Sequence, residues 1–175
     1  MKNRIHIVGA SGSGTTTLAK EFCKRFNYVH FDTDDFFWEK TDPPYQRQRK
    51  VIDRLNLLHE KLSTTEKWVL SGSLTGWGDV LIKYFDLVVY LWIPEELRLS
   101  RLKEREKGRY GDQILEGGSM HQSHLDFINW TKKYETGGLE VRSKFSHLKW
   151  LDKLECKVIK IEGDYTLDEK IDLLK

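Results

Sequence analysis

Two kinds of hydrophobic pattern alternate along the chain. Short, nearly continuous apolar runs predict buried strands, and they lie at residues 4–8, 28–31, 68–70, 87–93 and 157–161. Segments with apolar residues at every third or fourth position predict amphipathic helices, and they lie at residues 15–26, 51–62, 79–84, 94–107, 123–134, 139–154 and after Thr166. Strands that alternate with helices form a parallel sheet covered on both faces. We therefore predict a three-layer α/β fold with about five parallel strands.

The pattern shows no boundary that would divide the chain into two domains. We find no internal repeat, low-complexity segment or linker, so residues 1–175 are expected to form a single domain. One stretch interrupts the alternation, because residues 108–120 are rich in glycine and resemble a mobile loop. Together with the helix that follows it, this stretch predicts a small lid or insert at about residues 108–138.

Composition restricts the classes of protein to consider. Apolar residues make up 39% of the chain and charged residues 32%, which is typical of a globular protein. The formal net charge of +2 does not favour a nucleic-acid partner. The longest apolar run has seven residues, whereas a membrane span needs about 20, and the amino-terminal residues lack a signal-peptide pattern. We expect a cytoplasmic protein without a membrane or nucleic-acid partner, and with Cys23 and Cys156 reduced.

A glycine-rich loop, GASGSGTTT, joins the first strand to the first helix. Its residues are Gly9, Ala10, Ser11, Gly12, Ser13, Gly14, Thr15, Thr16 and Thr17. Backbone N–H groups of such a loop and the helix N-terminus form a concave anion site. The alternative is an ordinary strand-to-helix turn, but this many Gly, Ser and Thr residues favours phosphate binding. The loop departs from the pattern G-x-x-x-x-G-K-[ST], because Thr15 stands where the lysine would contact phosphates.

A stripe of arginines follows the fourth strand. Arg98, Arg101, Arg105 and Arg109 are spaced three, four and four residues apart, which places them on one side of a helix. The plain alternative is a solvated basic face. Beside a phosphate-binding loop, arginine forks suit phosphate oxygens, and the stripe leads into the predicted lid. We expect these arginines to supply the positive charge that Thr15 lacks.

Three carboxylates, Asp32, Asp34 and Asp35, follow the second strand. Ligands of an open parallel sheet bind at the carboxyl ends of its strands. A carboxylate at that edge can accept a proton from a substrate hydroxyl or hold Mg²⁺. The alternative is a cluster that caps the next helix, and Asp35 is open to that interpretation.

These motifs, in this order, resemble the P-loop kinases of the adenylate kinase and nucleoside or shikimate kinase group. The resemblance rests on GASGSGTTTLA, FDTDDFFW and PEELRLSRLKEREKGRYG. It implies a P-loop NTPase fold in which the loop binds ATP and Thr16, with Asp32 or its water, holds Mg²⁺. It further implies that Asp34 contacts or deprotonates the acceptor hydroxyl, and that Arg101, Arg105 and Arg109 clamp phosphates. The turn at Gly163 and Asp164 would lie near the nucleotide base.

The sequence thus predicts an ATP-dependent phosphotransferase that acts on a hydroxyl or phosphate acceptor. Its partners would be a nucleotide and a small-molecule acceptor, and the protein would be a monomer or homodimer. A second hypothesis is a nucleotide-binding regulatory protein with little or no catalysis, which the Thr15 departure favours. A third, a nucleic-acid binder using Arg47, Arg49 and Lys50, is disfavoured by the net charge.

Overall fold

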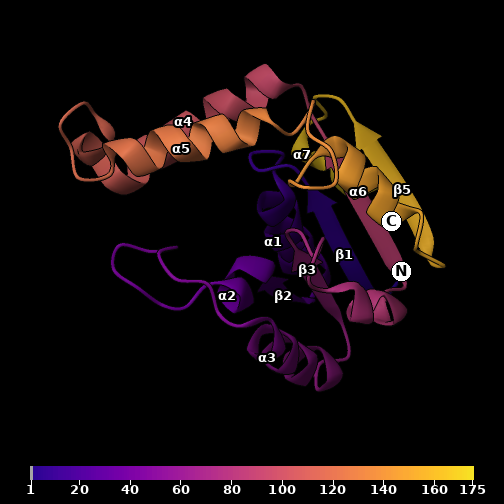
Figure 1. Ribbon diagram of the computed structural model, residues 1–175. Coiled ribbons are helices and arrows are strands. Elements are labelled where there is room, and N and C mark those ends of the chain that lie inside the picture. The colour runs from indigo at the N-terminus through magenta and orange to yellow at the C-terminus, as the bar shows by residue number, and fades with distance from the viewer. Residues whose placement is uncertain (1) are drawn as a thin grey trace.

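The computed structural model describes residues 2–175 (Figure 1). The strands are β1 (Arg4–Gly9), β2 (Val29–Asp32), β3 (Trp68–Ser71), β4 (Leu87–Trp92) and β5 (Lys157–Glu162). The helices are α1 (Thr15–Phe26), α2 (Thr33–Phe37), α3 (Val51–Ser63), α4 (Glu95–Tyr110), α5 (His121–Lys132), α6 (Lys144–Leu151) and α7 (Leu167–Asp172), with 3₁₀ helices at Asp79–Tyr84 and Gly111–Ile114. All strand pairs are parallel, in the order β2-β3-β1-β4-β5, which confirms the predicted fold class.

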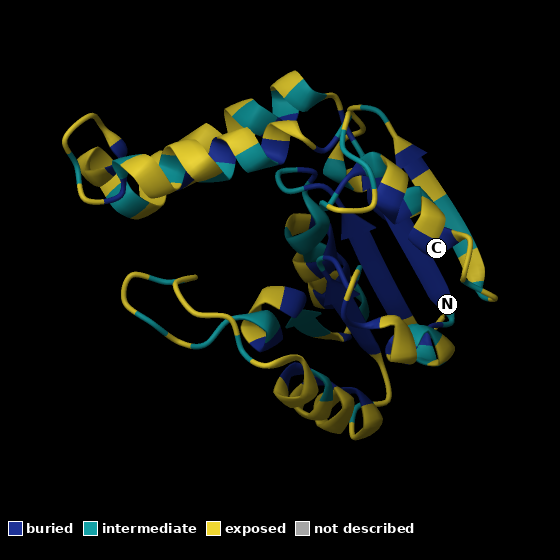
Figure 2. Cartoon of the chain, viewed as in Figure 1, coloured by how far each residue is buried: buried dark blue, intermediate teal, exposed yellow. Residues whose placement is uncertain are grey.

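Helices cover both faces of the sheet because side chains of a strand alternate between its faces. Ile5 and Ile7 of β1 point to one face, and Val8 points to the other. The first face is covered by α1 and α7 through Leu18, Ala19, Phe22 and Ile171, and by Leu174 just after α7. The opposite face is covered by α3, the first 3₁₀ helix and α6 through Leu58, Leu62, Leu81, Trp150 and Leu151. The central strands are consequently buried on both sides, as Figure 2 shows.

Two predicted boundaries were wrong. The glycine-rich stretch at residues 108–120 is not simply a loop, because α4 continues through Gly108 to Tyr110 and a 3₁₀ helix follows. Gly111, at φ 56°, ends α4 in a conformation that suits glycine. The helix expected at residues 139–154 is shorter, since Ser143 caps α6 in a capping box with Ser146.

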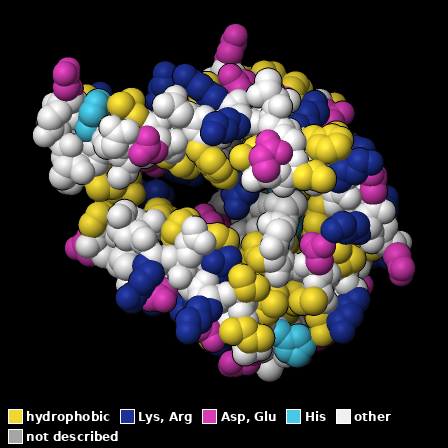
Figure 3. All heavy atoms as spheres, viewed as in Figure 1, with side chains coloured by type: hydrophobic (Ala, Val, Ile, Leu, Met, Phe, Trp, Pro, Cys, Tyr) yellow, Lys and Arg dark blue, Asp and Glu magenta, His cyan; other side chains and the backbone are white. Residues whose placement is uncertain are grey.

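Helices α4 and α5 form a hairpin (residues 95–132) that extends away from the sheet (Figure 1). The loop after α2 (residues 38–50) extends on the same side and faces this hairpin. Figure 3 shows the surface hollowed between the two. Across residues 2–175, no helix combines the length and apolar character needed to cross a membrane.

Candidate functional site

The glycine loop (residues 9–17) lies at the carboxyl edge of the sheet, where β1 sits between β3 and β4. Gly12 has φ 83°, and a Cβ on it would lie 2.8 Å from the carbonyl oxygen of Arg98. Gly14 has φ 93° and precedes α1 without a side-chain cap. The first-turn N–H groups of α1 therefore lack partners within the helix and face the space above the loop. This arrangement suits an anion.

Asp32 joins the end of β2 to the glycine loop. Its Oδ2 accepts a hydrogen bond from the Thr16 hydroxyl at 2.8 Å, and its Oδ1 accepts one from the backbone N–H of Asp34 at 3.0 Å. The second bond makes Asp32 the N-cap of α2. Because the Thr16 proton is directed at Asp32, the lone pairs of the Thr16 oxygen stay available to a cation.

The oxygen atoms of Thr16 and Asp32 suit Mg²⁺ that also binds a phosphate ligand, and are too few to hold a metal ion by themselves. Mg²⁺ prefers oxygen and usually takes one or two protein ligands together with phosphates and water. Thr16 and Asp32 supply such oxygens at the mouth of the anion site. Within residues 2–175, no group of three His, Cys, Asp or Glu side chains could enclose a metal ion. The donor set therefore suits a cation that arrives with a phosphate ligand.

Two cavities meet above Asp32 and Asp34. The larger, of about 930 Å³, lies between the glycine loop, α1 and residues 164–170. The smaller, of about 550 Å³, lies between residues 9–12 of the glycine loop, α2, the loop after α2 and the α4–α5 hairpin. The residues that line both cavities are Gly12, Thr15, Thr16, Asp32, Asp34, Tyr45, Arg105 and Arg109. Two ligands bound in these cavities would thus meet over the same few side chains.

Asp34 lies at this junction with its carboxyl exposed to the cavities. Desolvation between the cavity walls raises the pKa of this carboxyl, and the charge of Asp32 raises it further. Arg142 and Arg105 act in the opposite direction. A raised pKa makes an ionised carboxylate a better proton acceptor. Asp35, one residue on, is exposed and lines the larger cavity only.

Three of the four predicted arginines reach the cavities. Arg105 and Arg109 line both, and the guanidinium of Arg109 lies 4.9 Å from the ring centre of Tyr45 across the opening. Arg101 lines the larger cavity and pairs with Asp164 at 3.1 Å. Asp164 thus lines the larger cavity, whereas neighbouring Gly163 lines neither cavity.

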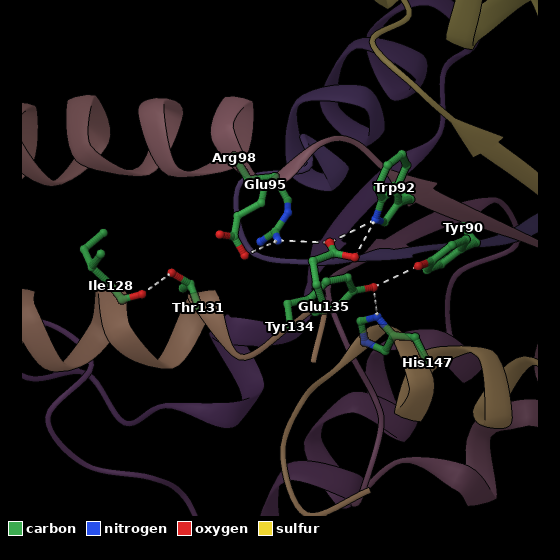
Figure 4. A network of polar contacts seen from close by, with 9 residues as sticks. All are labelled: Tyr90, Trp92, Glu95, Arg98, Ile128, Thr131, Tyr134, Glu135 and His147. Carbon is green, nitrogen blue, oxygen red and sulfur yellow. Dashed lines mark hydrogen bonds and ion pairs between the residues drawn. The ribbon is translucent and has the colours of Figure 1, made fainter. Parts of the chain in front are cut away.

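The fourth arginine of the stripe has a different role from the one predicted. Arg98 is completely buried, and its guanidinium lies 3.2 Å from Glu135 at the end of the hairpin. Trp92 donates to the same carboxylate at 3.0 Å (Figure 4). Arg98 thus joins the two ends of the hairpin and is withdrawn from the cavities. Because its side chain is completely buried, Arg98 cannot contact a phosphate bound in either cavity.

Comparison with known proteins places the chain in a family. A family model described as an AAA domain (AAA_18) matches residues 5–123. The chain belongs to this family. A Bacillus subtilis (strain 168) protein called uncharacterized protein YqaC is 45% identical over 172 residues, covering 98% of this chain and 95% of that protein. The cytidylate kinase of Archaeoglobus fulgidus is 31% identical over 114 residues, covering 59% of this chain and 62% of that enzyme.

The solved structures show the fold of this AAA_18 member. A shikimate kinase from Acinetobacter baumannii superposes with a TM-score of 0.58 over 98% of this chain and 89% of that chain, at 16% identity. The fold is therefore the kinase-like P-loop NTPase fold.

Sequence reasoning missed one charged residue of the candidate site. Arg142 lines the smaller cavity from the segment before α6, and its guanidinium lies 5.3 Å from the ring centre of Trp130. Burial lowers its pKa, and the charge of Asp34 opposes that shift. Among residues 2–175, no carboxylate lies within 4.0 Å of its guanidinium. A lone arginine between two helices carries no sequence signal that would have revealed this position.

Aromatic side chains form much of the smaller cavity's wall. Besides Trp130, they are Phe37, Trp38, Tyr45, Tyr110 and Phe127. Their sequence spacing does not group them, because α2, the loop after α2, α4 and α5 each contribute a part. The smaller cavity thus has flat aromatic walls, the Asp34 carboxyl, and one arginine, Arg142, that does not line the larger cavity.

Proposed function

We propose that the protein is an ATP-dependent phosphotransferase that moves the γ-phosphate of ATP to a small acceptor. The observation that carries the proposal is the meeting of two cavities over Thr15, Thr16, Asp34, Arg105 and Arg109. The glycine loop lines both cavities, and the larger one alone continues along α1 past Thr17 to Lys20. A donor and an acceptor bound on either side would place the transferred group at their junction, as in-line transfer requires.

The donor would occupy the larger cavity. The N–H groups of the glycine loop would bind its phosphates, and the Arg101–Asp164 pair lies at the end of the cavity that the nucleoside would reach. Thr16 and Asp32 would hold Mg²⁺ with the phosphates. Bound Mg²⁺ would offset the negative charge that builds up on phosphate oxygens.

The acceptor would occupy the smaller cavity, with its hydroxyl hydrogen-bonded to Asp34. As the acceptor oxygen forms its bond to the γ-phosphorus, the bond from phosphorus to the leaving oxygen of ADP breaks and the hydroxyl proton passes to Asp34. Arg142 would bind a negative group of the acceptor, because this arginine lines the smaller cavity and not the larger one, whereas Arg105 and Arg109 line both. A phosphate acceptor would use the same arginine and would need no proton acceptor.

Arg105 and Arg109 would replace the charge that Thr15 does not supply. Both side chains line the junction, and both come from α4, which leads into the lid predicted at about residues 108–138. An arginine that stabilises transferring phosphate can contribute several kcal/mol to catalysis. Relatives named cytidylate kinase and uridine kinase support testing pyrimidine nucleosides and nucleotides among the acceptors.

The second candidate is a regulatory protein that binds nucleotide without transferring phosphate, and the uncharged Thr15 favours it. Calorimetric titration with a non-hydrolysable ATP analogue, with and without Mg²⁺ and beside the GTP equivalent, tests what both candidates share. We expect micromolar, Mg²⁺-dependent binding. Binding weaker than about −4 kcal/mol, a millimolar dissociation constant, would contradict both. A product assay over hydroxyl compounds and nucleoside monophosphates then separates enzyme from regulator.

A further inference from the structure

A chain of hydrogen bonds ends at the carboxylate that contacts the glycine loop. His30 Nε2 lies 2.9 Å from Ser71 Oγ, and Ser71 Oγ lies 3.2 Å from Asp32 Oδ2. The same carboxylate oxygen accepts the Thr16 hydroxyl at 2.8 Å. Strand register explains the chain, since β2 and β3 pair Asp32 with Ser71 and His30 with Val69. The three polar side chains therefore lie on one face of the sheet, the face that α1 covers.

The chemistry of the groups fixes the direction of each bond. The Asp32 carboxylate can only accept, so Ser71 must donate its single proton to it. Ser71 can then only accept from His30, which requires the proton of the imidazole to sit on Nε2. This holds whether or not Nδ1 also carries a proton. The chain thus runs one way, from His30 to Asp32.

The orientation of the Ser71 hydroxyl depends on its hydrogen bond from His30. Ser71 is fully buried, and its hydroxyl has one proton that can turn toward more than one acceptor. A donor on its lone pair holds that proton on Asp32, and Asp32 in turn holds the Thr16 proton. Removing the imidazole donor would free the Ser71 hydroxyl to rotate. The carboxylate would then lose one of its three protein hydrogen bonds.

We propose that His30 is a positioning residue for the cation that accompanies the nucleotide. Acting through Ser71, it fixes the orientation of the Asp32 carboxylate and hence of the Thr16 hydroxyl. His30 also lines the larger cavity, but the proposal assigns its effect to the hydrogen bond with Ser71 and not to a contact with the nucleotide or the cation. The proposal rests on the proposed function, because it assumes that Thr16 and Asp32 hold Mg²⁺ together with nucleotide.

Two variants of His30 and one control variant test this role by calorimetry with the ATP analogue, in Mg²⁺ and in EDTA. His30→Phe keeps a ring but has no donor, and His30→Gln places an amide N–H near the position of Nε2. Changes in groups that orient metal ligands typically weaken metal binding about 10- to 100-fold. We expect His30→Phe to lose about tenfold of the Mg²⁺-dependent affinity with its affinity in EDTA unchanged, and His30→Gln to retain it. His59→Phe, an exposed histidine bonded to Tyr84, is the control.

The outcomes separate this inference from the proposed function. Mg²⁺-dependent binding that His30→Phe fully retains would overturn the inference alone. Absence of nucleotide binding by the unmodified protein would overturn the proposed function and the cation role with it. A spectroscopic test does not depend on the variants folding. Long-range ¹⁵N–¹H NMR on the unmodified protein should show a proton on Nε2 of His30, and a neutral ring protonated only on Nδ1 would overturn the chain.

Discussion

Replacing Asp34 with asparagine separates proton transfer from nucleotide binding. Asparagine has nearly the same shape and can still hydrogen-bond an acceptor hydroxyl, but its amide does not take up the proton. Asp34 lies where the two cavities meet, so the substitution acts on the proposed transfer step. We expect kcat for a hydroxyl acceptor to fall steeply while the affinity for ATP stays near that of the unmodified protein.

The size of the loss follows from the environment of the carboxyl. A positioned general base contributes about 100- to 10,000-fold, which corresponds to about 3–5 kcal/mol of activation free energy. The pKa of Asp34 is raised from its ordinary 3.8, so proton transfer to it is less uphill than to an ordinary aspartate. We therefore expect a loss within that range. Removing one of two neighbouring carboxylates also relieves repulsion with Asp32, so phosphate binding should not weaken.

The assay measures product formation with an identified acceptor, together with calorimetric affinity for the ATP analogue. Asp35→Asn is a matched control, because Asp35 belongs to the same helical turn but lines the larger cavity only. The pH profile adds an independent readout. Activity of the unmodified protein should fall as pH drops through the pKa of Asp34, since only the ionised carboxylate accepts a proton. The residual activity of Asp34→Asn should lack this acid limb.

Three results would refute the reasoning. Turnover of Asp34→Asn near that of the unmodified protein would show that no proton passes to this carboxyl. An equal loss in Asp35→Asn would show that charge at the end of β2 matters, rather than the position of Asp34. A loss confined to nucleotide affinity would move Asp34 from the acceptor to the donor.

Three further predictions concern the missing lysine, the unpaired arginine and the buried histidines. Arg105→Ala should lower kcat, and adding Thr15→Lys should recover much of it; product assays that find no recovery would contradict the substitution of one charge for the other. Arg142→Met should raise KM for a negatively charged acceptor about 10- to 100-fold, the value of a hydrogen bond to a charged group, with ATP affinity unchanged; equal effects on both ligands would contradict its assignment to the acceptor. Burial lowers the pKa of His6 to about 4 and of His147 to about 3. Between these values and about pH 6.5, both imidazoles are therefore protonated in the unfolded chain but neutral in the folded protein. Urea titrations should therefore show the free energy of unfolding decreasing by about 1.4 kcal/mol per pH unit for each histidine as pH falls from 6.5 toward 4, and His147→Gln should reduce that slope; an unchanged slope would contradict the neutral buried state.

Local signals account for the parts of the site that sequence predicts well. The apolar run of β1, the glycine loop and the periodic face of α1 are contiguous, so the strand, loop and helix can be read without knowing the rest of the fold. Asp32 ends β2 and Asp34 comes shortly after it, and parallel topology fixes the edge on which they lie. The roles proposed for these residues remain predictions.

Long-range packing decides what the sequence could not reveal. Spacing places Arg98 on the arginine stripe, but its burial depends on Glu135, which reaches it from the far end of the hairpin. Arg142 belongs to the cavity because the segment before α6 passes beside α5, and no periodicity encodes that passage. Gly108 did not end α4, because a glycine within a helix costs only about 1 kcal/mol.

The same packing bears on which arginine can act for the absent lysine. Arg98 fixes the start of α4 against the glycine loop, since its carbonyl oxygen would lie 2.8 Å from a Cβ on Gly12 and its guanidinium is held by Glu135. Arg105 follows seven residues later, about 10 Å along the axis, and Arg109 eleven residues later, about 16 Å. Helical side chains lean toward the N-terminus, so both lean back toward the loop. The guanidinium of Arg105 starts nearer the loop and that of Arg109 lies over Tyr45. Arg105 is therefore the better placed of the two to replace the lysine, and Arg109 the better placed to close the opening.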